Sequence, residues 1–218
     1  TDDKQVVNET LADWKENTVY EKTNGETKRT NAYYANGQLA RQTDALDNTI
    51  KYEYGTLNKL TKTYTPFNGK EKYSVTENQY DKNGNVILTR QTVQKEDSST
   101  VKYSITQNEY NGLGLLSKVT LSGTGSNEKN ITQYFYNHDG IETEMRTGLS
   151  SDNDTSYLKT EYVYDSRNHL VRTKDSTGYN SGTITYDLNG NVLTNTDSNG
   201  NVTTNTYDAL NLSLIHIS

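Results

Sequence analysis

Short runs of acidic and amide residues are the parts of this sequence whose side chains could bind a metal ion. The runs are DKNGN from Asp81, DLNGN from Asp187, DSNGN from Asp197 and SSDNDT from Ser150. A calcium-binding EF-hand loop needs oxygen ligands at positions 1, 3 and 5, glycine at 6 and glutamate at 12. Counted from Asp187, glycine falls at position 4 and serine at position 12. We therefore interpret these runs as turns, and predict no metal ligand.

Catalytic chemistry has little support in the sequence. The histidines are His138, His169 and His216, and the first two occupy variable turn positions. There is no G-x-S-x-G nucleophile motif, and the glycine-rich stretches fail G-x-G-x-x-G at the last glycine. The many carboxylates are attached to turns, so that no glycosidase-like pair stands out. We predict a chain that is not an enzyme, with no catalytic and no cofactor-binding residue.

The composition is polar but rich in tyrosine. The 218 residues carry a net charge of -6, only 30% are hydrophobic, and there are 18 Tyr against 2 Phe and 1 Pro. Disordered chains are usually poor in aromatic residues and rich in proline, whereas tyrosine is favoured in strands. The composition therefore predicts an all-β protein that packs through its tyrosines.

Several classes of partner are disfavoured by the same composition. An acidic chain without basic clusters is not expected to bind nucleic acid. No apolar run approaches the length of a membrane span, and no signal peptide opens the chain at Thr1. The missing initiator methionine indicates a fragment, and the absence of cysteine leaves the redox compartment undetermined.

One heptad recurs through most of the chain: a tyrosine is followed, four residues later, by glycine or asparagine. Successive tyrosines, called anchors below, are 21 to 30 residues apart. The pairs are Tyr33 and Gly37, Tyr54 and Asn58, Tyr80 and Gly84, Tyr110 and Gly114, Tyr136 and Gly140, Tyr164 and Asn168, Tyr186 and Gly190, and Tyr207 and Asn211. Gly and Asn enter the left-handed backbone region at the lowest cost, so each heptad is predicted to contain one positive φ.

The flanks of the heptad predict a β-hairpin. Before the turn, tyrosines alternate with polar residues, as in Tyr162 and Tyr164, which places them on one strand face. Six residues past most anchors comes Leu or Val, with Glu142 and Ser213 as exceptions. A second turn begins at Asp44, Asp175 and Asp197. The longer inserts LSGTGSNEKN and TGLSSDNDTS are polar and predict surface loops.

These features divide the sequence into three parts. Residues 1–24 are irregular and resemble the back half of a preceding unit; they contain Trp14, for which strand and short helix both stay open. Residues 25–211 form the array of eight hairpin units. Residues 212–218 leave the repeat and resemble a translated sequencing adaptor, with a hydrophobic strand as the alternative.

The pattern Y-D-x-x-G-N-x followed by D-x-x-G resembles the YD repeat of rearrangement-hotspot (RHS) proteins, bacterial wall-associated proteins, Tc-type insecticidal toxin shell subunits and teneurins. The resemblance covers about Gly25 to Asn211. It implies antiparallel hairpins in part of a spiralling β-shell that often encloses a toxic domain. The acidic terminal region that closes such shells is missing here, so autoproteolytic residues cannot be assigned.

The resemblance implies a non-catalytic wall segment of a secreted or surface-associated bacterial protein. Its partners would be the rest of its own polypeptide and an enclosed toxin or cargo domain. The alternative is a module for adhesion or for binding cell-wall carbohydrate through exposed tyrosines. The identity of the cargo and the target cell, and the ability of the fragment to fold alone, stay open at this stage.

Overall fold

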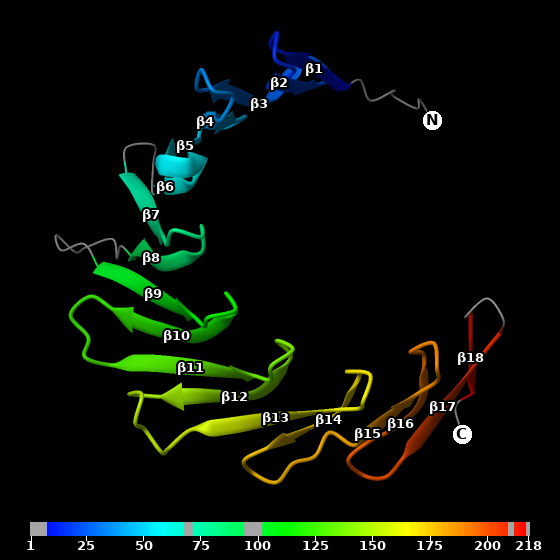
Figure 1. The fold of residues 1–218 in the computed structure, drawn as a ribbon. Coiled ribbons are helices and arrows are strands. Elements are labelled where there is room, and N and C mark those ends of the chain that lie inside the picture. The colour runs from blue at the N-terminus through cyan, green and yellow to red at the C-terminus, as the bar shows by residue number, and fades with distance from the viewer. Residues whose placement is uncertain (1–7, 68–71, 94–101, 209–211, 217–218) are drawn as a thin grey trace. The chain divides into compact units, whose positions relative to one another are not determined.

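The computed structural model describes residues 8–67, 72–93, 102–208 and 212–216, and this part of the chain is almost entirely β-sheet (Figure 1). It contains 18 strands and one 3₁₀ turn, η1 (Thr56–Asn58). The prediction of an all-β fold built from hairpins is confirmed. The strands are β1 (Asn8–Ala12), β2 (Thr18–Thr23), β3 (Glu26–Tyr33), β4 (Leu39–Asp44), β5 (Thr49–Tyr54), β6 (Leu60–Phe67), β7 (Lys72–Tyr80), β8 (Val86–Val93), β9 (Lys102–Tyr110), β10 (Leu116–Gly123), β11 (Lys129–Tyr136), β12 (Glu142–Leu149), β13 (Leu158–Tyr164), β14 (Leu170–Asp175), β15 (Thr183–Tyr186), β16 (Val192–Thr196), β17 (Val202–Tyr207) and β18 (Ser213–His216).

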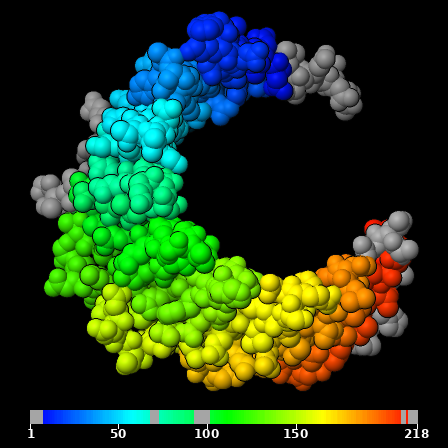
Figure 2. Space-filling view, viewed as in Figure 1, coloured from blue at the N-terminus to red at the C-terminus, as the bar shows by residue number. Residues whose placement is uncertain are grey.

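Within each of two sheets, every strand pairs with the next one in the sequence. Strands β1 to β14 follow one another in one sheet, and β15 to β18 form a second sheet of four strands. The pairing is antiparallel, as in β5 with β6 and β16 with β17. Two compact units divide the chain: Thr1–Gln107 with Ser122–Asn127, and Asn108–Leu121 with Glu128–Ser218. Within each unit, the colours of the space-filling view follow the order of the chain (Figure 2).

The sheet has very little buried core. Among the described residues, the buried side chains are Ile131, Leu149 and Thr120, with exposed fractions of 4%, 1% and 7%. Most strand residues are half-buried, because they are covered only by neighbours in the same sheet. Stability in such a structure comes from contacts between adjacent units, as in repeat proteins.

The prediction that both long inserts are surface loops is partly wrong. Strand β10 continues into the first insert as far as Gly123, and β12 continues into the second as far as Leu149. Leu149 pairs with Ile131 across an irregular register. Gly148 has a φ of 81°, and it precedes the most buried leucine of the described residues. The glycine obscured the strand pattern in the sequence.

The predicted left-handed positions are present in the turns. Positive φ angles occur at Gly37 (88°), Asn58 (57°), Gly84 (86°), Gly114 (78°), Gly140 (80°), Asn168 (67°) and Gly190 (87°). This confirms the turn prediction for seven heptads, while Asn211 lies outside the described residues. The second turn has the same conformation, with positive φ at Asp47, Gly178 and Gly200.

A turn lies near one end of the described chain and a strand near the other. Trp14 lies in the turn between β1 and β2, and its side chain is 87% exposed. It therefore belongs neither to a strand nor to a helix. Near the other end, Ser213–His216 forms β18, which pairs with β17 over Thr204 to Tyr207.

The turn geometry predicts a position-specific cost of adding a side chain. Changing Gly190 to alanine forces a Cβ onto a backbone with φ of 87° and leaves it 3.3 Å from Nε2 of His169. We expect Gly190→Ala to lower the free energy of unfolding by about 1–2 kcal/mol. Gly112 lies in an equivalent turn without a positive φ and with no atom near its Cβ position. Gly112→Ala should therefore leave the urea midpoint almost unchanged, and equal effects of both changes would contradict the assignment.

Candidate functional site: contacts that join successive hairpins

Anchor tyrosines connect hairpins to the preceding ones through their hydroxyl groups. At six anchors, the hydroxyl donates a hydrogen bond to a main-chain carbonyl oxygen 15 to 20 residues earlier in the sequence. The pairs are Tyr33 to Thr18 (2.8 Å), Tyr54 to Leu39 (3.1 Å), Tyr80 to Leu60 (2.6 Å), Tyr136 to Leu116 (2.7 Å), Tyr186 to Leu170 (2.7 Å) and Tyr207 to Val192 (2.9 Å). In all but the first pair, the acceptor is the aliphatic residue six positions past the previous anchor. We call this contact the tyrosine clamp.

The acceptor of the clamp lies at an irregularity in the sheet. Within a hairpin, the anchor pairs with the aliphatic residue six positions later, as Tyr54 does with Leu60, and the register shifts there. The same shift occurs at Tyr80 and Tyr186. A bulge interrupts the ladder of main-chain hydrogen bonds and leaves backbone groups in need of partners. The next anchor tyrosine supplies a donor at this point.

The clamp persists where the main-chain ladder is interrupted. Between β14 and the segment that leads into β15, the ladder is reduced to an isolated bridge that joins Lys174 and Asn180 and a main-chain hydrogen bond from Ser181 to Thr173. Tyr186 of β15 nevertheless donates to the carbonyl oxygen of Leu170 in β14. The clamp therefore links the second unit's part of the first sheet to the sheet of four strands.

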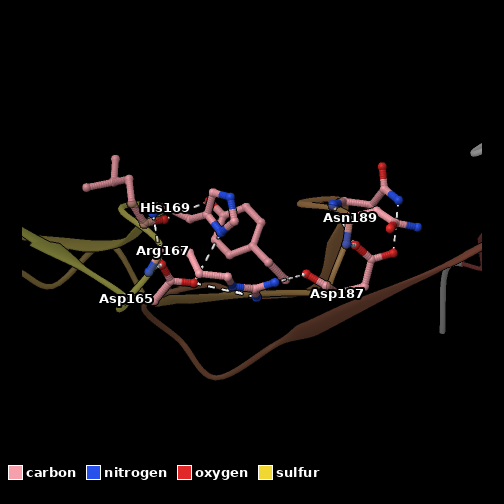
Figure 3. A network of polar contacts seen from close by, with 8 residues as sticks. Asp165, Arg167, His169, Asp187 and Asn189 are labelled. Atoms are coloured by element: carbon pink, nitrogen blue, oxygen red, sulfur yellow. Dashed lines mark hydrogen bonds and ion pairs between the residues drawn. The ribbon is translucent and has the colours of Figure 1, made fainter.

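Turn residues add a second set of contacts at the same junction (Figure 3). Nη1 of Arg167 donates to the carbonyl oxygen of Asp187 at 2.8 Å. The ring of His169 lies 4.7 Å from the ring of Tyr186, and its Nδ1 is 3.2 Å from a carboxylate oxygen of Asp165. One turn thus contacts both the backbone and the anchor of the next turn.

The residue after the left-handed position packs against the following turn. A Cβ on Gly84 would lie 2.9 Å from Nζ of Lys59, and one on Gly140 would lie 3.2 Å from Cδ1 of Leu115. His169 has the same relation to Gly190. These glycines are favoured by the left-handed backbone, and the side chain of the preceding turn lies close to each of them.

The turn carboxylates bind the backbone of their own loop. Oδ1 of Asp187 accepts hydrogen bonds from the main-chain N–H groups of Asn189 and Asn191, both at 2.8 Å. Asn111 and Asn137 do the same with their side-chain oxygens. The amide of Asn191 donates to the second oxygen of Asp187, and this bond is the main cause that lowers the pKa of the Asp187 carboxyl. These oxygens are therefore engaged by the protein itself.

The same loop occurs once in the first segment, where the repeat pattern did not predict it. Asp13, in the irregular first segment, accepts from the main-chain N–H groups of Lys15 and Asn17, and Glu16 has a φ of 65°. The Asp-x-x-x-Asn spacing was a signal for this turn, but the expected Gly or Asn is replaced by Glu16. No group of three or more His, Asp and Glu side chains suited to a metal ion occurs among the described residues.

One repeat has a carboxylate at the position that is aliphatic in most of the others. Six residues past Tyr136 stands Glu142 in place of an aliphatic residue. Burial raises the pKa of the Glu142 carboxyl, and a hydrogen bond with Tyr162 acts in the opposite direction. Tyr164, the anchor that follows, is half-buried, and burial raises the pKa of its hydroxyl. The sequence identified Glu142 as an exception but not its tyrosine partner.

Comparison with known proteins agrees with this geometry. The family model described as Teneurin YD-shell matches residues 11–214. A crystal structure of TcdB2-TccC3 without its hypervariable C-terminal region superposes with a TM-score of 0.63 at 14% identity, over 99% of this chain and 13% of that one. The Photorhabdus luminescens Tc holotoxin pore gives a TM-score of 0.39 at 12% identity, over 99% of this chain and 15% of that one. No curated protein matches the sequence.

Within the described residues, no helix has the length and apolar character needed to cross a membrane.

The clamp predicts a measurable role for a single oxygen atom. We expect Tyr186→Phe to lower the free energy of unfolding by about 1–2 kcal/mol, because the carbonyl of Leu170 loses its donor. Tyr179→Phe is the matched control, because this tyrosine is 56% exposed. Equal urea midpoints for the two variants would contradict a stabilising clamp.

The turn carboxylates predict a loss of stability in acid. Hydrogen bonds lower the pKa of Asp13, Asp81, Asp165, Asp175, Asp187 and Asp197 below 3.8, and that of Asp154 to about 2. A depressed folded-state pKa contributes stability above the unfolded-state value, and this stability is lost as the pH falls through the folded-state value. Glu142 acts in the opposite direction, because its pKa is raised. The melting temperature should fall as the pH is lowered from about 4 to about 2. Circular dichroism melts that are unchanged across this range would contradict the interpretation.

A pair of variants separates the hydrogen bonds of the turn from its charge. Asp187→Asn keeps an acceptor oxygen like that of Asn111, whereas Asp187→Ala removes both bonds to the backbone. At pH 7 we expect the alanine variant to melt at a lower temperature than the asparagine variant. If both variants instead melted at the same temperature, well below the wild type, the charge rather than the acceptor would be the stabilising feature.

Proposed function

The chain belongs to the teneurin YD-shell family, and we propose that it forms a non-catalytic segment of the wall of a shell that encloses a toxin or other cargo domain. The family and the fold support a structural shell role. The chain spans only about 13% of the structure with which it superposes at a TM-score of 0.63. Enclosure of a cargo is therefore our proposal for the longer protein.

The tyrosine clamp is the observation that carries this proposal. A wall must resist separation of its hairpins, although each hairpin buries little apolar surface on its own. The clamp supplies a directional bond between hairpins in the same register, from Tyr33 near one end to Tyr207 near the other. It tolerates inserts of different length, because the donor and the acceptor both lie at the heptad end of the hairpin.

The turn carboxylates and His169 have structural partners. The turn carboxylates accept main-chain hydrogen bonds, as at Asp81 and Asp165. His169 is held by Asp165 and stacks on Tyr186. This supports a wall segment without chemistry of its own.

The remaining parts of the proposal concern the longer protein. We place it in a bacterium, secreted or at the cell surface, with the enclosed domain and the rest of the polypeptide as partners. Residues 25–211 would be the repeat array. The alternative, a module that binds cell-wall carbohydrate, is favoured by one specific observation, an open groove lined with tyrosines in the first unit.

Enclosure can be tested by chemical accessibility, because this chain has no cysteine. In the full-length protein, a single cysteine is introduced into the domain that follows the repeats, and its reaction with a polymer-linked maleimide is timed. The control is Leu188→Cys, at a turn where the native side chain is 93% exposed. We expect rapid labelling of the control and labelling of the cargo cysteine only after denaturation. Equal rates in the folded protein would overturn the proposal.

A further inference from the structure

A groove in the first unit combines tyrosine rings with two positive charges. It has a volume of about 520 Å³, and the residues that line it include Tyr34, Arg41, Lys51, Glu53, Tyr64 and Tyr73. Two neighbouring hollows of about 550 and 560 Å³ also border on Tyr34. These volumes lie within the range of small-molecule sites.

The tyrosine at the edge of the groove interrupts the turn pattern. The position after the anchor is Asp or Asn in the six later repeats, but it is Tyr34 in the first and Gly55 in the second. The first turn therefore lacks the acceptor that binds two N–H groups elsewhere, and Asn36 accepts from the N–H of Gln38 instead. Tyr34, which departs from the pattern, lines the groove, and this indicates a role for its side chain other than shaping a turn.

Tyr34 is held in a defined position although it is 44% exposed. Its hydroxyl donates to the carbonyl oxygen of Tyr52 at 2.9 Å, and its ring meets that of Tyr54 edge to face at 6.2 Å. On the other side of the groove, Tyr64 and Tyr73 form a similar edge-to-face pair at 6.3 Å. The aromatic surfaces are thus fixed before a ligand arrives, which reduces the entropic cost of binding.

The two cations of the groove face each other. Arg41 and Lys51 are directly opposite in the β4–β5 register, and both side chains are exposed. Like charges at opposite positions destabilise a sheet. Neither forms an ion pair with a carboxylate of the described residues. The carboxylate of Glu53, which also lines the groove, accepts a hydrogen bond from the hydroxyl of Tyr64 at 2.9 Å. The ammonium group of Lys51 lies 4.9 Å from the ring centre of Tyr73. An anion placed between these cations would relieve their repulsion.

We propose that this groove binds an acidic saccharide of the uronic acid type. A sugar has an apolar C–H face that can pack on a tyrosine ring, and hydroxyl groups that match the polar edge of such a groove. Its carboxylate would lie between Arg41 and Lys51, where a guanidinium can bind both oxygens. This goes beyond the wall function and does not depend on it, because the groove uses residues outside the tyrosine clamps.

Isothermal titration calorimetry on the 218-residue chain tests the proposal with three probes: trigalacturonate, neutral maltotriose and inorganic tripolyphosphate. We expect trigalacturonate to bind about tenfold more tightly than maltotriose, because only the former carries carboxylates. Arg41→Gln and Lys51→Gln should each weaken trigalacturonate by about tenfold. Lys82→Gln is the control, since it removes one charge from an exposed turn position away from the groove.

The aromatic part of the site needs its own variants. Tyr34→Ala should weaken both saccharides, whereas Tyr34→Phe keeps the ring and should retain binding, with circular dichroism melts to verify folding. In one contrary outcome, tripolyphosphate binds as tightly as trigalacturonate and its binding is unaffected by Tyr34→Ala. That result would overturn the proposal of a saccharide site and indicate a general anion site. An acidic peptide that competes more strongly than trigalacturonate would assign the groove to a protein partner. No heat from trigalacturonate at millimolar concentration, or equal losses from Lys82→Gln and Arg41→Gln, would also overturn the proposal.

Discussion

The hydrogen bond from a tyrosine hydroxyl to a carbonyl of the preceding hairpin is the interaction on which the rest of the structure depends. A sheet whose described residues bury only two apolar side chains cannot be stabilised by a core. Its hairpins must be joined by contacts to their neighbours. Tyrosine suits this role, because its ring supplies apolar area on the sheet and its hydroxyl reaches a backbone acceptor at the end of that ring. Phenylalanine would supply only the area, and the chain has 2 Phe against 18 Tyr.

The clamp also explains why the turns share a left-handed residue at the same position. The hydroxyl reaches its acceptor only when each heptad positions its anchor and its bulge in the same way. The Asp or Asn after the anchor fixes the loop by binding two N–H groups, and the left-handed residue closes it, as Asp187 and Gly190 do. Glycine at that position further admits the side chain of the preceding turn, such as His169. Local turn chemistry therefore sets the register of a contact between hairpins.

Much of this fold could be predicted from the sequence, because its determinants are local. The heptad, the positive φ at Gly84 or Gly190 and the hairpins all follow from residues within a few positions of one another. The clamp could not be predicted, because its donor and acceptor lie in different hairpins, 15 residues apart for Tyr54 and 20 for Tyr136. The burial of Leu149 was missed since Gly148 and the polar insert around it resembled a loop. Tyr34 and Arg41 become neighbours in a groove only through strand pairing.

The alternation of side chains along a strand separates stability from surface chemistry. The anchor tyrosines and the aliphatic residues lie on one face, which carries the clamps. Residues between them point to the other face, where charged pairs such as Lys62 with Glu77 form at 2.9 Å. Exposed ion pairs of this kind contribute little to stability. That face can therefore change its residues at small energetic cost, and Arg41 and Lys51 of the groove are exposed in paired strands. The repeat thus constrains the residue types on one face of the sheet and leaves those on the other face variable. Binding sites can therefore arise on the variable face in individual hairpins.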